Sequence, residues 1–188
     1  MNYKEINKEV LYTTDTIVTI NSGDIERLKD MAASNSRKRV RLCCHNDIEN
    51  ILHEMLIVHA RGVYIRPHKH IAKSESFHII QGKLNVVIFN DDGSILEVVT
   101  MSDYGSNENF FYRLSKNYFH TVIPQSNWAV FHETTNGPFR RKDTIFAPWA
   151  PDEDDSKKTR IYLNKLEKQV SGFIARISLK RRRKHDHI

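Results

Sequence analysis

The sequence predicts a mainly β protein, a jelly-roll barrel of two sheets followed by one long helix. Three observations lead to this prediction. Short segments in which apolar and polar residues alternate recur between residues 53 and 134. Turn signals rich in asparagine and glycine separate them, the strongest being Asn90-Asp91-Asp92-Gly93. Many short strands joined by such turns are typical of a double-sheet barrel, and helical spacing returns only after residue 156.

Before the strands, the segment 24–33 has apolar residues at helical spacing, and Asp24 is suited to the helix start. A basic stretch over residues 37–41 follows it. From residue 53 the period changes to two, as expected for strands with one buried face. The expected strands are residues 53–60, 63–70, 75–81, 83–90, 95–101, 109–114, 120–123 and 128–134.

The segment 148–155 is rich in proline and acidic residues and ends the β pattern. A helix is expected from residue 157 to about residue 179. Its narrow apolar stripe either pairs with a second copy in a homodimer or lies on the barrel; the stripe consists of Leu163, Leu166, Val170, Phe173 and Ile177. We expect three parts: an N-terminal helical segment (1–36), the barrel (37–151), and an acidic linker, amphipathic helix and basic tail (152–188).

The 188-residue chain has a formal net charge of +6, and most of it comes from residues 152–188. The body is therefore nearly neutral. The sequence has neither a long apolar run nor a signal peptide, which favours the cytoplasm. The basic run 180–185 suits an anionic membrane surface, or it is a solvated helix end. Nucleic acid is an unlikely partner, because the body has no basic patch with aromatic residues.

A possible metal motif spans Gly62-x5-His68-x-His70-x4-Glu75-x6-Gly82. Residues two apart on a strand point to the same face, so His68 and His70 can direct two imidazoles at one point. Glu75, on the next expected strand, can add an oxygen there. A second His-x-His pair, His185 and His187, lies in the basic tail, so the pair alone is weak evidence. The flanking glycines and the carboxylate make the first pair a candidate site for a divalent metal ion.

This motif matches, without a gap, the first sequence motif of the cupin superfamily. The second cupin motif is less complete and aligns on His120, with Ser115 replacing its proline and Asn117 its inner glycine. The resemblance implies a cupin-type double-stranded β-helix fold. It also implies a divalent metal, one of Fe, Mn, Zn, Ni or Co, held by four ligands: His68, His70, Glu75 and His120.

A narrower resemblance covers residues 37–155. The chain is similar there to the WbuC-type cupin metalloproteins, small bacterial proteins associated with O-antigen and other surface-polysaccharide gene clusters. The segments that carry it are Arg66–His70, Glu75–His78, Phe119–Val122, Gly137–Phe139 and Phe146–Pro151.

Two functions are compatible with this resemblance. One is a metal-dependent isomerase, epimerase or oxygenase acting on a small, sugar-derived or nucleotide-sugar substrate in surface-polysaccharide biosynthesis. Such work would place the protein at the cytoplasmic side of the inner membrane. The other is a non-catalytic module that binds a small ligand and assembles through its C-terminal helix.

Three further residues are candidates for catalysis. Strand parity extended from His68 places Tyr64 and Arg66 in the cavity. Arg66 then either binds a carboxylate or phosphate of the substrate, or forms a salt bridge that orients Glu75 or closes the barrel mouth. His132 lies next to Glu133, and only one of this pair can face inward; we take His132 as the candidate base.

Overall fold

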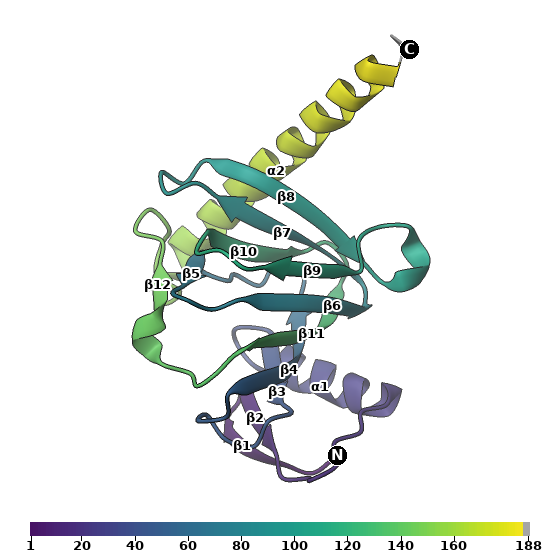
Figure 1. Cartoon of the computed structure of the whole chain (residues 1–188), viewed down its shortest axis with the longest axis vertical. Coiled ribbons are helices and arrows are strands. Elements are labelled where there is room, and N and C mark those ends of the chain that lie inside the picture. Colours follow the sequence, from purple (N-terminus) through teal and green to yellow (C-terminus); the bar gives the residue numbers. More distant parts are fainter. Residues whose placement is uncertain (186–188) are drawn as a thin grey trace.

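The computed structural model describes residues 1–185, with side chains to residue 180. It confirms the predicted fold class: two β-sheets face each other, a short helix lies near the N-terminus, and a long helix ends the chain (Figure 1). Strands adjacent in a sheet are mostly distant in sequence, as in a jelly roll. No helix among the described residues is long and apolar enough to span a membrane.

The first sheet has seven strands, in the order β1 (Tyr3–Asn7), β2 (Val10–Thr13), β3 (Arg39–Cys43), β4 (Leu52–Ala60), β11 (Trp128–Asn136), β6 (Glu75–Gln81) and β9 (Phe111–Leu114). The second has five, in the order β12 (Thr144–Phe146), β5 (His68–His70), β10 (Phe119–Pro124), β7 (Lys83–Phe89) and β8 (Ile95–Ser102). Neighbours are antiparallel except for β2 and β3. Two 3₁₀ turns complete the elements: η1 (Tyr104–Ser106) and η2 (Arg141–Asp143).

The main core lies between the sheets and follows strand parity. On β6, Phe77 and Ile79 are buried in it, whereas His78 is exposed, as the alternating pattern predicts. β7 is apolar except at Lys83 and Asn85, because both of its faces are covered. Val86 faces the inner core, and Val87 packs under the C-terminal helix. Each fully buried side chain of this size contributes about 1.5–3 kcal/mol of transfer free energy.

Helix α1 (Ser22–Ser34) packs on the outer face of the first sheet, where Leu28 contacts a cluster that includes Val40 and Val58. Its start is a capping box. The Asn21 side chain accepts a hydrogen bond from the Asp24 backbone, and the Asp24 carboxylate accepts one from the Asn21 backbone. Asp24 is thus at the helix start, as expected, but as the third helical residue.

Helix α2 (Ser156–His185) covers the second sheet with its first half and extends past the barrel with its second half (Figure 1). Leu163, Leu166 and Val170 are buried against the barrel, whereas Phe173 and Ile177 are only partly buried. The first half of the predicted stripe therefore lies on the barrel. The structure does not describe the side chains of the basic run beyond Lys180, and this includes the side chain of His185. His187 lies outside the described residues.

The structure adds three strands that the sequence analysis did not predict near the N-terminus. β1 exposes almost all of its side chains, so it carries no alternation signal. β2 is only four residues long. β3 lies in the basic stretch, where Arg39 and Arg41 alternate with Val40 and Leu42. The N-terminal segment therefore contributes a hairpin to the first sheet as well as a helix. The division of the chain at residues 36 and 151 stays a prediction.

Candidate metal centre and its cavity

Three histidines from two adjacent strands meet at one end of the barrel. His68 on β5 lies directly opposite His120 on β10 in the strand register, and His70 follows two residues later on β5. One ring nitrogen from each lies within 4.8 Å of the others. The fold therefore brings together the three histidines of the predicted ligand set.

Hydrogen bonds at the far ring nitrogens orient these imidazoles. Nδ1 of His68 is 2.9 Å from the Arg66 carbonyl oxygen, and Nδ1 of His120 is 3.0 Å from the Tyr118 carbonyl oxygen. A carbonyl only accepts, so both Nδ1 atoms carry the proton and donate. Nδ1 of His70 lies 3.2 Å from the Thr144 hydroxyl. The Nε2 atoms of His68 and His120 are thus the unprotonated ring nitrogens. Metal-binding histidines commonly have such a hydrogen bond from the other ring nitrogen.

Glu75 adds a carboxylate to the three imidazoles. Its Oε1 lies 2.8 Å from Nε2 of His120, and its Oε2 lies 3.6 Å from Nε2 of His70. The 2.8 Å contact does not have hydrogen-bond geometry. Within the described chain, neither Oε1 of Glu75 nor Nε2 of His120 has a hydrogen-bond partner. Both residues are buried, with exposed fractions of 5% and 3%. A carboxylate oxygen and an imidazole nitrogen, both buried and unpartnered, fit a set of ligands around a divalent cation.

At His68 and Glu75, the electrostatics favour the protonation states that a metal requires. Burial, with help from His120 and His70, lowers the pKa of His68 to about 3, so this imidazole is neutral. Burial alone would raise the pKa of Glu75. The charge of His120 and its contact with the carboxylate have the larger effect and lower this pKa to about 2. In return, Glu75 raises the pKa of His120 against the effect of burial. In the metal-free protein a proton can therefore occupy the place that a cation would take.

The two glycines of the motif have backbone angles that suit only glycine. Gly62 and Gly82 have φ values of 80° and 85°. A Cβ on Gly82 would also collide with the backbone oxygen of Trp128. Gly82 forms the tight turn from β6 to β7, and Gly62 turns the chain after β4. These glycines therefore fix the strands that carry the histidines and Glu75.

A cavity of about 540 Å³ opens beside this cluster, and His68 and His70 form part of its wall. The wall across from them comes from β1 to β4. Its apolar lining includes Val10, Met55 and Ile57. The charged groups that line it are Glu9, Arg39, Arg41, Arg66, Lys73, Glu133, Arg141 and Glu153. A cavity of this size can hold a small organic molecule.

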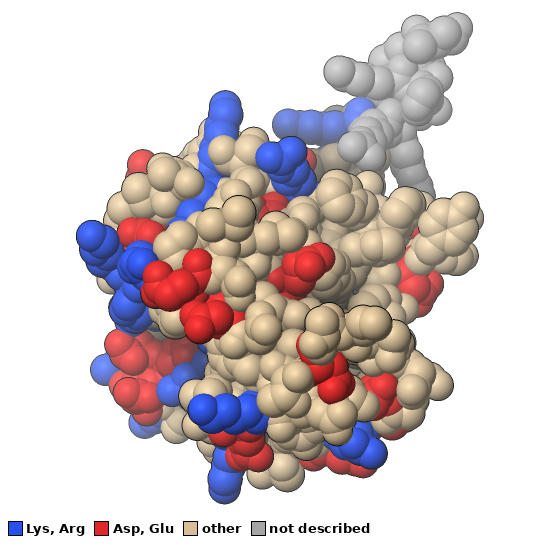
Figure 2. Space-filling model, turned by 60° about the horizontal axis from the view of Figure 1, so that its bottom comes forward, with Lys and Arg blue, Asp and Glu red and all other residues tan. Residues whose placement is uncertain are grey.

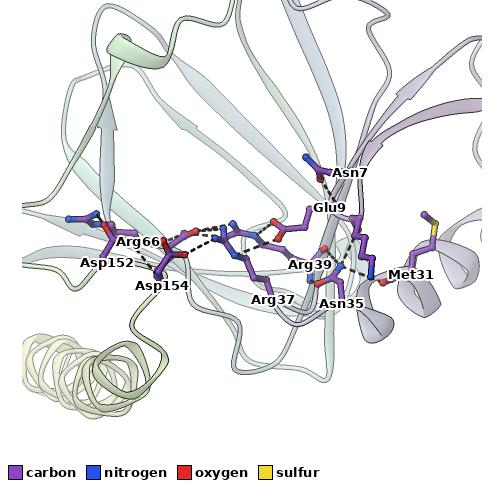
Figure 3. Close-up of polar contacts among 11 residues, drawn as sticks. Asn7, Glu9, Met31, Asn35, Arg37, Arg39, Arg66, Asp152 and Asp154 are labelled. Atoms are coloured by element: carbon purple, nitrogen blue, oxygen red, sulfur yellow. Dashed lines mark hydrogen bonds and ion pairs between the residues drawn. The ribbon is translucent and has the colours of Figure 1, made fainter.

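An ionic cluster closes one side of the cavity (Figure 3). The Glu153 carboxylate accepts hydrogen bonds from Arg39, at 2.9 Å and 3.2 Å, and from Arg37, at 2.7 Å. Glu9 binds Arg39 from the opposite side at 2.8 Å. The acidic linker thereby connects the N-terminal hairpin to the start of α2. On the face shown in Figure 2, acidic and basic side chains lie side by side, in agreement with a nearly neutral body.

Arg66 lies at this rim and is already paired. Its Nη1 lies 2.7 Å from the Asp152 carboxylate, and its guanidinium lies 4.9 Å from the centre of the Phe146 ring. It lines the cavity, as parity predicted, but its partner is a carboxylate of its own chain. The structure thus shows a salt bridge of Arg66 with Asp152, and a role of Arg66 in substrate binding stays a prediction.

Tyr64 is not oriented as expected. Its hydroxyl donates to the Pro151 carbonyl at 2.9 Å, its ring packs on Tyr162 of α2, and it is not among the residues that line the cavity. The reason is local. β5 begins only at His68, so residues 63–67 are not a strand, and parity could not be extended back to Tyr64.

His132 faces away from the cavity and Glu133 faces into it. Nε2 of His132 lies 3.7 Å from a Glu54 oxygen, and its side chain is 37% exposed. Glu133 lines the cavity and is directly opposite Phe77 in the register, two residue pairs away from Glu75. The pair thus has one member in the cavity wall, as expected, and this member is Glu133, so the candidate base His132 is not placed in the cavity. The buried Phe131 two residues earlier was the available signal for Glu133, because the two share a face.

Burial raises the pKa of Glu133 to about 7, and the nearby charge of Glu75 adds to this effect. Within the described chain its carboxylate forms no ion pair. A carboxyl group that titrates near neutral pH beside a metal centre is suited to holding or moving a proton.

The comparisons with known proteins give one family match and several structures of low similarity. A family model described as a domain of unknown function (DUF6016) matches residues 20–101, which is less than half of the chain. No curated protein sequence matches the chain.

Several solved structures are similar at low sequence identity. The cupin domain of Cnp3 from Schizosaccharomyces pombe is 13% identical, with a TM-score of 0.42, over 53% of this chain and 64% of that one. The capsular polysaccharide assembling protein CapF from Staphylococcus aureus is 18% identical, with a TM-score of 0.43, over 52% and 27%. A double-stranded β-helix domain protein from Klebsiella pneumoniae is 12% identical, with a TM-score of 0.45, over 58% and 84%. The chain thus spans less than two thirds of the first two.

Proposed function

We propose that the chain is a metal-binding cupin whose ligands are Nε2 of His68, His70 and His120 and the carboxylate of Glu75. The observation that carries this proposal is the buried 2.8 Å contact between Glu75 and His120, in which neither atom has a hydrogen-bond partner in the described structure. Three nitrogens and one oxygen suit Fe, Mn, Zn, Ni or Co as the divalent ion.

We further propose that the centre is enzymatic. A divalent metal held by His68, His70, His120 and Glu75 would supply Lewis acidity at the cavity wall. The chain itself contributes a cavity large enough for a small polar substrate, beside which Glu133 can hold or release a proton. Isomerisation, epimerisation and oxygenation are all compatible with this arrangement.

The WbuC-type resemblance supports a sugar-derived or nucleotide-sugar substrate in surface-polysaccharide (O-antigen) biosynthesis. The mixed polar and apolar lining of the cavity is compatible with such a molecule.

We propose that the protein acts in the cytoplasm at the surface of the inner membrane, with the basic run 180–185 contacting anionic lipid. Co-sedimentation with anionic vesicles tests the membrane contact. The full chain should bind more strongly than a chain ending at residue 179, and equal binding would exclude this role for the tail.

Metal analysis of the purified protein tests the proposed centre. The wild type should carry a divalent metal at close to one equivalent per chain. His70→Ala should lose it while keeping the β circular dichroism spectrum, because His70 is a partly buried wall residue and not part of the apolar core. His78→Ala is the matched control, because His78 is exposed on β6. A wild-type protein without stoichiometric metal, or a His70→Ala variant that keeps it, would exclude the proposal.

One observation favours a second candidate function, a non-catalytic binding module that forms a homodimer through α2. The second half of α2 extends past the barrel and bears partly buried Phe173 and Ile177 (Figure 1). Light scattering tests this role. Ile177→Asp should convert a dimer to a monomer, whereas Ala175→Asp, at an exposed site on the same helix, should not. A monomeric wild type would rule out assembly through α2.

A further inference from the structure

The cations around the cavity are not equivalent, because most have partners within the chain. Arg39 binds the carboxylates of Glu9 and Glu153. Arg66 binds Asp152. Two others contact carbonyl oxygens: Lys73 donates to Pro138 and Arg141 to Thr144. These contacts satisfy most of the positive charge at the rim.

Arg41 is different. It lines the cavity from β3, its side chain is exposed there, and it forms no hydrogen bond or ion pair with any side chain that the structure describes. Parity explains its orientation, because it shares a face of β3 with Arg39 and Cys43, which also line the cavity. Its position is a strand interior, so its direction is set by the sheet and not by a loop.

The groups around Arg41 do not balance its charge. His45 and His53 stack in parallel with ring centres 3.9 Å apart, and both are buried in the cavity wall. Burial first, and Arg41 in part, lower the pKa of both, so they are neutral at pH 7. Glu133 on β11 also lines the cavity, but Arg41 forms no ion pair with it or with any other described carboxylate. A guanidinium that faces a cavity without a counter-charge is suited to an oxyanion of a ligand.

We propose that the cavity binds a small molecule that carries a carboxylate or phosphate group, and that Arg41 is the residue that anchors this group. Other arginines of the chain show the contact that is needed, because Arg37, Arg39 and Arg66 bind carboxylates at 2.7 to 2.9 Å. The inference deepens the proposed function, since it takes this cavity as the substrate site and names the charge of the substrate. The metal cluster and Arg41 then lie on opposite walls and bind different parts of one ligand.

Isothermal titration of the full-length, metal-free protein tests the anchor, with inorganic phosphate and malonate as separate probes at constant ionic strength. At least one probe should bind the wild type, and its identity distinguishes a phosphate ligand from a carboxylate ligand. Arg41→Gln should weaken this binding about tenfold or more, as expected for a charged hydrogen bond. Arg113→Gln is the matched control, because Arg113 is exposed on β9 and does not line the cavity.

Two results would overturn the anchor: no binding of either probe to the wild type, or equal affinity in the wild type and Arg41→Gln. Equal losses in Arg41→Gln and Arg113→Gln would also overturn it, because they would indicate a general charge effect. A separate titration of the same metal-free preparations with a divalent metal ion measures metal uptake and separates this inference from the proposed function. Stoichiometric metal without anion binding contradicts only the anchor, whereas anion binding without any metal uptake contradicts only the metal centre.

Discussion

At the scale of single residues, the hydrogen bonds at Nδ1 of the three histidines are as important for the proposed metal site as the ligand atoms themselves. Each Nδ1 has an acceptor or hydroxyl within 3.2 Å, which fixes the ring and directs Nε2 toward Glu75. Two of these partners are backbone carbonyls and cannot be removed by substitution. The third is the Thr144 side chain, so it gives the most direct test of ring orientation.

Thr144→Val should lower metal affinity about 10–100-fold, because it removes the hydroxyl that orients His70 while keeping the side-chain volume. Competition with a chromogenic chelator measures this affinity. Thr134→Val on β11 is the control. It has no described side-chain hydrogen bond and should keep wild-type affinity. Equal affinity in Thr144→Val and the wild type would show that the Thr144 contact has no role.

The pH dependence of metal binding follows from the same residues. Glu75 raises the pKa of His120 in the metal-free protein, so a proton competes with the metal for Nε2. Affinity should therefore be highest above this raised pKa and fall steadily as the pH is lowered through it. Metal retained after desalting at a series of pH values measures the effect. Constant retention from neutral to acidic pH would contradict the assignment of His120 as a ligand.

At the scale of secondary structure, two features fix the position of the cluster: the glycine turn after β6 and the cover that α2 forms over β7. Gly82 combines a positive φ with a close backbone oxygen. On α2, Leu166 is 3% exposed and packs into a cluster that contains Val87 and Phe89. Changes at these positions should act on stability and not on the metal ligands directly.

Gly82→Ala should destabilise the fold by about 1–3 kcal/mol through backbone strain alone, with a further cost from the clash with Trp128. Urea unfolding measures the free energy. Gly105→Ala is the control, because a Cβ there meets no atom. If the two variants were equally stable, the turn would not need glycine.

Leu166→Ala should cost about 2–5 kcal/mol, because it leaves a cavity under α2. Ile161→Ala, at a site that is 60% exposed on the same helix, should change stability by less than about 0.5 kcal/mol. Thermal unfolding of both variants provides the comparison. A small effect at Leu166 would show that α2 is not firmly attached to the barrel.

The strands and the metal motif could largely be predicted from the sequence, because alternation and glycine turns are local signals. β6, for example, has the predicted bounds. Predictions failed where the signal was not local. β1 exposes its side chains and has no apolar period, so only its pairing with β2 defines it. Tyr64 and His132 were misplaced because their orientation depends on where β5 begins and on which face of β11 meets the core.

At the scale of the whole molecule, residues distant in sequence meet at Glu153. Its carboxylate contacts Arg37 and Arg39 and accepts a hydrogen bond from the Arg66 backbone at 3.3 Å. Burial opposes the charged form of Glu153, but these partners outweigh it and lower its pKa. A lowered folded-state pKa means that the carboxylate stabilises the fold above its unfolded pKa of about 4.3, and that this contribution is lost as the pH falls through the folded value.

Glu153→Gln should therefore lower the free energy of unfolding at pH 7, and the difference from the wild type should shrink as the pH is lowered below about 4. Asp154→Asn is the control. The Asp154 side chain is 88% exposed, and among the residues with described side chains it pairs with Arg37 alone, so its loss should have little effect. A difference between the wild type and Glu153→Gln that does not change with pH would exclude the ionic explanation.

The same linker has a mechanical consequence. Asp152 and Glu153 hold the rim of the cavity through Arg66 and Arg39, and α2 starts at Ser156, only three residues after Glu153. The segment between these ion pairs and the start of α2 is therefore too short to move independently of either. A force or a partner that displaces the protruding end of α2 therefore strains the ion pairs at the cavity entrance. Access to the cavity and the position of that helix are physically linked through three residues of chain.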